Sequence, residues 1–260
     1  MISTAIASET AHAAASAAPK LEPLHHFQVQ KIVPLSLFGW DISITNSSLW
    51  MMISVAAILL FFKMALKNEA KVPGRLQSLA EMGFVFARDL VQDNIGDEGR
   101  KYFPLVLALF FFVLFNNLLG LIPGSFTATS QLIVTGTLAI GVFILSVGIG
   151  VARHGVGFLK TFAPGGLPLA LLPLMIPIEV ISFLARPVSL AVRLFANMTA
   201  GHTVLGVMIF FTVTLPVWAG VIPLSFAVVL TGVEIFIGFI QAYIFAILTC
   251  VYINDAMHMH

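Results

Sequence analysis

Charged residues are scarce in this sequence, and cysteine is nearly absent. Only 10% of the 260 residues are charged, whereas 59% are hydrophobic, and the formal net charge is +1. Soluble domains carry about 25% charged residues, so the composition excludes a soluble globular protein. A net charge this small also gives no indication of a nucleic-acid partner. The one cysteine, Cys250, lies in an apolar run, which predicts a buried, inert thiol and excludes a disulfide framework.

Motifs that would indicate an enzyme are missing as well. The sequence has no glycine-rich phosphate-binding loop, no cluster with metal-ligand spacing and no pattern typical of a nucleophile triad. His25 and His26, and the terminal His258 and His260, are more typical of solvated segments than of a metal site. We therefore expect no metal, no cofactor and no catalytic activity of the chain's own.

Long apolar runs dominate what is present. Phenylalanine (23), glycine (20) and proline (13) are frequent, and Gly and Pro are more common in membrane helices than in soluble ones. Runs at 47–66, 103–122 and 130–152 match the ~20 residues that cross a bilayer. No Lys, Arg, Asp or Glu occurs from Pro104 to Ala152. The sequence thus predicts an all-α polytopic membrane protein with upright transmembrane helices.

Residues 75–95 have a different character. Their apolar positions recur every three or four residues, with charges between them, at Leu76, Leu79, Gly83, Phe86 and Leu90. This spacing predicts an amphipathic helix at the membrane surface, with a solvated loop as the alternative.

The basic residues indicate the orientation of the chain. They gather in 63–101 and 153–160, which lie on one side if 103–152 is a hairpin. Because short basic loops face the cytoplasm, or the matrix of an organelle, we expect the N-terminal segment 1–46 on the outer side. Residues 1–20 are Ala-rich and resemble neither a secretory signal nor a transit peptide, so we interpret them as a mobile terminus.

The region 161–260 is expected to form two much longer helices. Prolines crowd its start and recur at Pro187, Pro216 and Pro223, but none lies between 187 and 216 or after 223. Helices at 178–214 and 224–253 would be roughly 55 and 45 Å long. The hydrocarbon core is about 30 Å thick, so such helices must tilt strongly. The alternative is a break in the first helix at Gly201 or Gly206.

Polar residues form a stripe on the first long helix. Glu179, Arg186 and Arg193 are spaced seven apart, which is nearly two turns and places them on one face. Small and polar residues keep this face low enough for close approach of another helix: Ser182, Ala185, Ser189, Ala196 and Asn197. His202 lies nine residues beyond Arg193 and faces another direction. On the second helix, Glu234 and Gln241 are again seven apart.

Charges within a membrane span are costly and mark an ion path or a charged partner. Glu179 and Arg186 could form a structural ion pair. Arg193 cannot lose its proton, so its charge needs compensation, either from Glu234 or from a carboxylate on another subunit.

Other classes of protein remain open at this point. A stand-alone secondary transporter with a midplane site would explain the Gly and Pro interruptions, although no internal repeat is apparent. A structural membrane anchor would not need Arg193, His202 and Glu234 in apolar surroundings.

Two motifs resolve the choice by resemblance: RPVSLAVRLFANMTAGH at 186–202 and EIFIGFIQAYIFAILTCVYI at 234–253. Together they resemble the family of ATP synthase a subunits, the stator half of the proton turbine. HHFQVQKI at 25–32 and NNLLGLIPG at 116–124 are also similar to members of that family, so the resemblance covers nearly the whole chain beyond residue 20.

The resemblance implies roles in proton translocation for five residues around the stripe. Arg193 matches the family's essential arginine, and Asn197 and Gln241 match polar residues close to it. Glu179 and Ser189 match positions associated with the exit path on the cytoplasmic side.

A second group is implied for the inlet. His202 and Glu234 fall where the family places an acid and a histidine, but in reversed order, which suggests that the two side chains approach each other. Asn116 and Asn117 are expected to line the inlet, where Gly120 stands at a position that is acidic in some bacterial members.

These positions predict two aqueous half-channels that do not join. His202 and Glu234 would serve the outer one, Glu179 and Ser189 the inner one, with Arg193 between them. The resemblance further implies that ion flow rotates a proteolipid c-ring and so drives ATP synthesis. The partners it implies are the c-ring, peripheral-stalk b-type subunits, the remaining synthase subunits and the lipid bilayer. A bacterial inner membrane is favoured over a mitochondrial one because a transit peptide is not apparent.

The expected organisation has three parts. Residues 1–46 form an outer-side N-terminal segment, and residues 47–160 hold transmembrane helices with the amphipathic surface helix 75–95. Residues 161–260 form a tilted helical hairpin that carries the ion path.

Overall fold

A computed structural model describes residues 31–33, 36–37, 40–41, 43–67, 73–122, 124–155, 157–158 and 172–258. The segment 1–30, which includes the terminus 1–20 interpreted above as mobile, lies outside the described residues, as does the segment 159–171. Six helices account for most of the described chain: α2 Asn46–Ala65, α3 Arg75–Ile95, α4 Phe103–Gly120, α5 Leu132–His154, α6 Leu172–Thr214 and α7 Val217–Met257. Short 3-10 helices, η2 Asp97–Lys101 and η3 Ala128–Ser130, flank α4.

Two small antiparallel ladders precede the first helix. β1 (Lys31–Val33) pairs with β4 (Ile44–Thr45), and β2 (Ser36–Leu37) pairs with β3 (Trp40–Asp41). The hydroxyl of Thr45 then caps α2 by accepting from the Ser48 backbone N–H, which satisfies one of the free donors at the helix start.

The helical membrane fold predicted from the sequence is confirmed. Within the described residues, five helices are long and apolar enough to cross a membrane: α2, α4, α5, α6 and α7. The first three agree with the predicted runs 47–66, 103–122 and 130–152 to within two residues at each end.

The helix α3 has the predicted bounds, and part of its apolar set is buried within the chain. Leu76 and Leu79 are exposed, whereas Ala80, Ala87 and Leu90 are buried. Small residues allow the helix to lie close to α4: a Cβ on Gly83 would come within 2.6 Å of the Phe111 ring. The spacing of the apolar residues predicted the helix, and its small residues allow one face to pack against α4.

The two C-terminal helices are unbroken, which confirms the long, tilted pair and rules out a break at Gly201 or Gly206. α6 has 43 residues and α7 has 41. Both begin earlier than predicted, because α6 tolerates Pro177 and α7 tolerates Pro223; Pro187 lies inside α6 as expected. At 1.5 Å per residue α6 is about 64 Å long, so keeping it within a ~30 Å core requires a tilt of roughly 60°.

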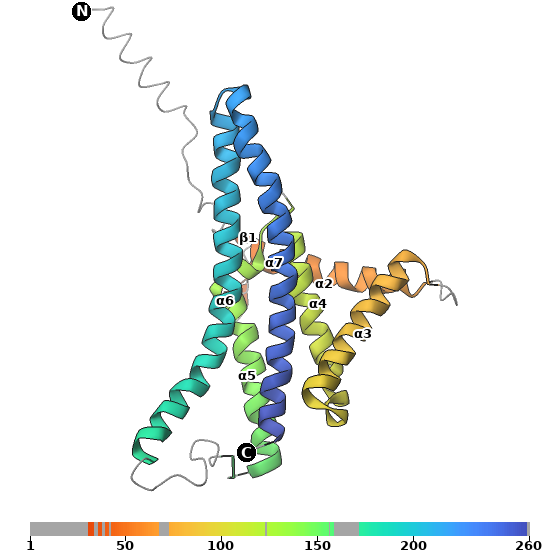
Figure 1. Ribbon diagram of the computed structural model, residues 1–260, viewed down its shortest axis with the longest axis vertical. Helices are drawn as coiled ribbons and strands as arrows, with labels where there is room; N and C mark the ends of the chain where they lie inside the picture. The colour runs from red at the N-terminus through yellow and green to blue at the C-terminus, as the bar shows by residue number, and fades with distance from the viewer. Residues whose placement is uncertain are drawn as a thin grey trace, which may run out of the picture.

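α6 and α7 run antiparallel as a long hairpin (Figure 1). Three contacts fix their alignment. Near the turn, a Cβ on Gly220 would lie 2.8 Å from the Thr212 carbonyl oxygen. In the middle, Gly201 lies against the carboxyl group of Glu234. At the far end, Arg186 pairs with Asp255 at 2.7 Å. The first turns of α6 lean away from α7 in Figure 1, as expected where prolines interrupt helix hydrogen bonds.

The core lies where α4, α5 and α6 meet α7. Fully buried side chains from three of these helices meet there: Val106, Val113, Leu194, Phe245 and Ile253. Ser146 on α5 donates to the backbone carbonyl of Tyr252 on α7 at 2.8 Å. α7 is therefore the central element against which the other helices are positioned.

The ends of α5 and α7 are tied together at the basic side of the molecule. The His154 ring Nε2 lies 3.2 Å from the Met257 carbonyl oxygen. Arg153 pairs with Glu98 on η2, and this hydrogen bond and charge lower the pKa of Glu98 below its ordinary value. Because the pKa of Glu98 is lowered, the pair stabilises the fold at pH values above the ordinary carboxyl pKa. This stabilisation is lost as the pH falls and Glu98 becomes protonated.

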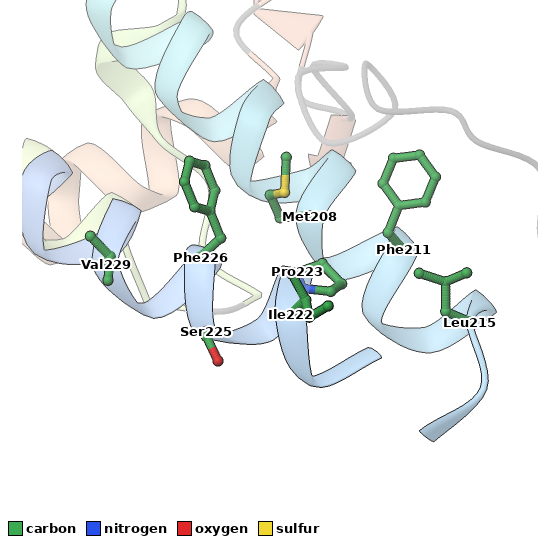
Figure 2. Close-up of a pocket in the computed structure, with 8 residues that line it drawn as sticks. All are labelled: Met208, Phe211, Leu215, Ile222, Pro223, Ser225, Phe226 and Val229. Atoms are coloured by element: carbon green, nitrogen blue, oxygen red, sulfur yellow. The ribbon is translucent and has the colours of Figure 1, made fainter. Parts of the chain in front are cut away.

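A groove lies beside the turn between α6 and α7 (Figure 2). It has a volume of about 470 Å³ and is lined by Met208, Phe211, Leu215, Ile222, Pro223, Ser225, Phe226 and Val229. The hydroxyl of Ser225 donates to the Val221 carbonyl of its own helix. This groove offers apolar surface only and is not part of a polar path.

Gly220→Ala should destabilise the protein by about 1–3 kcal/mol, because its Cβ would press on the Thr212 backbone, which cannot move aside. The matched control is Gly232→Ala, where nothing lies within 4 Å of the new Cβ. Alanine there should be neutral or stabilising by up to about 1 kcal/mol. The midpoint of thermal unfolding in detergent compares the two variants, and equal midpoints would contradict the close contact.

Candidate ion path

Arg193 lies on the exposed side of α6. Leu190, Leu194 and Met198 point into the core and are at most 4% exposed. Arg193 is exposed in the isolated chain, together with Ser189 and Asn197, which lie one turn before and after it. Helix periodicity therefore separates an apolar packing face from a polar face that the described residues leave uncovered.

The positive charges of the two arginines of the stripe, Arg186 and Arg193, differ in whether the chain itself neutralises them. Arg186 pairs with Asp255 and lies 5.7–5.8 Å from the ring centroids of Tyr252 and Phe183. In the described ranges, Arg193 forms no ion pair with an acid of its own chain. The predicted alternative in which Glu234 compensates Arg193 is therefore not realised here.

The suggested pair between Glu179 and Arg186 is wrong, because Arg186 is engaged by Asp255. The reason lies in the tertiary structure. The end of α7 runs antiparallel to the first half of α6, and this brings Asp255, 69 positions away in sequence, next to Arg186. Glu179 remains half-buried on α6, on the side of Arg186 away from Arg193.

His202 faces the loop between α4 and α5 instead of the Arg193 side. Its ring Nε2 lies 2.8 Å from the hydroxyl oxygen of Thr127. Thr127 is buried, as are the following residues of η3, Thr129 and Ser130. A cluster of hydroxyl groups thus lies against α6 one half turn away from the arginine.

Glu234 on α7 lies next to this cluster. It is only 7% exposed, and its carboxyl group lies against Gly201, the neighbour of His202 in sequence. Neither carboxyl oxygen has a hydrogen-bond partner among the residues that the structure describes. A side chain at position 201 would displace this carboxyl group.

The two asparagines of α4 are buried and hydrogen-bonded. Asn117 accepts from the Thr129 hydroxyl at 2.8 Å and donates to the Gly238 carbonyl at 3.1 Å. Asn116 accepts from the Ser54 hydroxyl at 3.1 Å and donates to the Phe112 carbonyl at 2.8 Å. These bonds join α4 to α2, to η3 and to α7 at the level between Glu234 and Gln241.

The contacts also set the level of each group along the hairpin. Gly201 faces Glu234, so Arg193, eight residues earlier on α6, is level with residues near Gln241 on the antiparallel α7. Gln241 is buried. At 1.5 Å per residue, His202 is about 14 Å from Arg193 along the helix axis, and Glu179 about 21 Å on the other side.

Sequence reasoning missed Thr127, Thr129 and Asp255. The polar run 125–131, SFTATSQ, stands out between two apolar helices and could have indicated buried hydroxyl groups. Nothing in the sequence indicates which helix they meet. Among the described residues, no three His, Cys, Asp or Glu side chains lie close enough together to hold a metal ion.

Five helices that are long and apolar enough to cross a membrane, with polar groups buried among them, define an integral membrane protein. The sequence matches the family described as ATP synthase A chain over residues 48–254. It is 60% identical to the ATP synthase subunit a of Magnetococcus marinus over 98% of this chain and 100% of that protein. Against the subunits a of Mesorhizobium japonicum and Rhodospirillum rubrum the identities are 48% and 49%, over 93% and 92% of this chain and 98% and 99% of theirs. The chain belongs to the ATP synthase A chain family.

Replacing either partner of the Arg186–Asp255 pair should lower stability, and the losses should not add. Arg186→Gln and Asp255→Asn, alone and combined, are expected to give a coupling energy of about 0.2–1 kcal/mol, because both side chains are partly exposed. Unfolding of the purified protein in detergent measures this cycle. The control is the same cycle with Glu179→Gln and Arg186→Gln, for which we expect no coupling energy. Coupling in this second cycle alone would show that Arg186 pairs with Glu179 and not with Asp255.

Proposed function

We propose that this chain is the proton-conducting stator subunit of a rotary ATP synthase in a bacterial inner membrane. It is not an enzyme by itself. Its partners are a proteolipid c-ring, peripheral-stalk b-type subunits and the remaining subunits of the complex. The single observation that carries the proposal is Arg193: a permanent charge on an apolar helix, exposed, and without an acid of its own chain within the described ranges.

A guanidinium in this position needs an external anion, because a cation in apolar surroundings is costly and Arg cannot deprotonate. A carboxylate on a rotating ring of helical hairpins meets this need. Ser189 and Ala196 keep the Arg193 face low, which supports the close approach of another helix. Asn197 and Gln241 supply polar contacts at the same level.

Two polar groups on opposite sides of Arg193 serve as the half-channels in this proposal. The outer group comprises His202 and Glu234, with Asn116 and Asn117 beside them, and the inner group comprises Glu179 and Ser189. The half-turn offset between His202 and Arg193, and the buried Leu194 and Met198 between their levels, support separate routes. Residues 161–260 carry this path, while residues 47–160 support it and residues 1–46 lie on the outer side.

The mechanism follows from this arrangement. A proton entering from outside passes by way of His202 and Glu234 to a carboxylate of the ring; imidazole suits such a relay because it exchanges protons near neutral pH. The neutral carboxyl faces lipid at far lower cost than a carboxylate. After most of a turn the carboxyl loses its proton to the inner group, and the ionised form is attracted by Arg193. A charge crossing 100 mV releases about 2.3 kcal/mol, which drives rotation.

Arg193→Ala should abolish proton transport coupled to ATP while leaving the complex assembled, and Arg193→Lys should be inactive or weak because an ammonium is compact and can deprotonate. ATP-driven acidification of inverted membrane vesicles measures this. The control is Arg88→Ala on α3, which removes an exposed arginine paired with Asp89 and should leave transport unchanged. Normal ATP synthesis in Arg193→Ala membranes would disprove the assignment.

Crosslinking tests the exposed face directly. With Cys250 replaced by serine, cysteine at Ser189 or Ala196 should crosslink to a proteolipid that carries a cysteine near its buried carboxyl. Cysteine at Leu190 or Leu194, which point into the core, should not. A stand-alone transporter predicts no proteolipid crosslink at any of the four positions and substrate binding by the isolated chain.

A further inference from the structure

The ion pair between Arg186 and Asp255 has no role in the function proposed above. Asp255 lies near the end of α7, and its carboxyl oxygen is 2.7 Å from a guanidinium nitrogen of Arg186. Two aromatic rings also flank the guanidinium: Phe183 of its own helix at 5.8 Å and Tyr252 of α7 at 5.7 Å. An acid of the same chain thus neutralises one of the two arginines of the stripe.

We propose that Asp255 is a positioning residue that masks the charge of Arg186, so that Arg193 is the free cation that a ring carboxylate meets on α6. This inference rests on the proposed function, in which the carboxyl groups of a rotating ring pass the uncovered face of α6. Arg186 itself takes no part in proton transfer. Its charge is held aside because it lies where the ring carboxyl exchanges its proton with the inner half-channel.

The position of Arg186 on α6 supports the need for masking. Arg186 precedes Arg193 by seven residues, so the two are about 10.5 Å apart along the helix axis and about 20° apart around it. The exposed face of α6 continues past the level of Arg186, because Ser182 and Ser189 are exposed on either side of it. A carboxylate that moves along this face toward Arg193 therefore passes the level of both arginines.

A second free guanidinium at this level would hold the ring carboxylate in the inner half-channel. Arg186 lies between Glu179 and Ser189 in sequence, which are the two residues of the proposed inner group. The ring carboxyl has to lose its proton there and move on to Arg193, or take up a proton there when rotation is reversed. A free cation attracts the ionised form and slows both steps. Pairing with Asp255 removes most of this attraction, because the two opposite charges largely cancel beyond their own contact.

The part of α7 that carries Asp255 is held in place by α5. The backbone carbonyl of Tyr252, three residues before Asp255, accepts from the Ser146 hydroxyl at 2.8 Å. The backbone carbonyl oxygen of Met257, two residues after Asp255, lies 3.2 Å from the His154 ring Nε2. Because these contacts do not involve the Asp255 side chain, a substitution there should remove the charge and leave the helix in position.

ATP-driven acidification of inverted membrane vesicles tests the masking, with the amount of assembled complex measured in the same membranes. Asp255→Asn frees the charge of Arg186 and should reduce pumping per complex about two- to fivefold, since one partly exposed ion pair changes a rate by about that factor. Arg186→Gln should pump almost normally, because it removes the charge that needs masking. The double variant, Arg186→Gln with Asp255→Asn, should pump almost normally for the same reason.

The recovery in the double variant distinguishes masking from a pair that only holds α6 to α7. A purely structural pair would be lost in either single variant, and removing the second partner would not restore pumping. Asp255→Glu keeps the negative charge and should therefore retain most of the pumping. The matched control is Asp89→Asn, which removes an exposed acid that pairs with Arg88 on α3 and should leave pumping unchanged.

Three pumping results would overturn the inference: normal pumping by Asp255→Asn, an equal loss in Arg186→Gln, or no recovery in the double variant. Failure of Asp255→Asn to assemble would show that the pair is needed for the structure, and would overturn the masking role as well.

Arg193→Ala separates this inference from the proposed function. If Arg193→Ala abolishes pumping but Asp255→Asn pumps normally, the masking role is wrong and the proposed function stands. If Arg193→Ala pumps normally, the role of Arg193 as the cation of the stator is wrong, and the masking role is wrong with it.

Discussion

The charge of Arg193 cannot be removed, and the rest of the arrangement has to accommodate it. A guanidinium keeps its proton at any physiological pH, and in apolar surroundings it requires an anion. Arg186, seven residues earlier, meets that requirement inside the chain through Asp255 and two aromatic rings. Arg193 does not do so within the described residues. Of the two arginines on one stripe, Arg186 is thus paired within the chain and Arg193 is not. Arg193 faces outward, where a second subunit can reach it.

The position of Arg193 depends on the length of α6 and α7 and on how closely these two helices pack. α6 and α7 are about twice as long as the ~30 Å hydrocarbon core, so their tilt spreads Glu179, Arg193 and His202 along the membrane plane as well as across it. Glycines at the contacts bring the two helices together: Gly220 against the Thr212 backbone and Gly201 against Glu234. A bulkier residue at position 201 would displace the one buried acid of α7. Backbone proximity and the polar chemistry of the site therefore depend on the same small residues.

Patterns within one segment could be read from the sequence, whereas contacts between distant segments could not. The absence of proline between 187 and 216 indicated a continuous helix, and the apolar spacing of 75–95 gave both ends of α3. The spacing did not show which residues of α3 the fold buries: Ala80, Ala87 and Leu90 are buried, whereas Leu76 and Leu79 are exposed. Glu179 was suggested as the partner of Arg186 because it was near in sequence; Asp255 is near only once α7 has folded back. Thr127 lies in a loop, where no periodicity indicates which side chain it meets.

The separation of the two proposed half-channels is a matter of packing as much as of charge. His202 and Arg193 are half a turn and about 14 Å apart on one helix, and Leu194 and Met198, which lie between them in sequence, are 1% and 4% exposed. On the core side of α6, side chains packed this closely leave no space for a chain of water molecules, since protein interiors have few voids of that size. In the proposed mechanism a proton therefore cannot move directly from the His202 side to the Arg193 side through this subunit. It has to leave α6, travel on a carboxyl group that the chain does not possess, and return on the other side of the arginine.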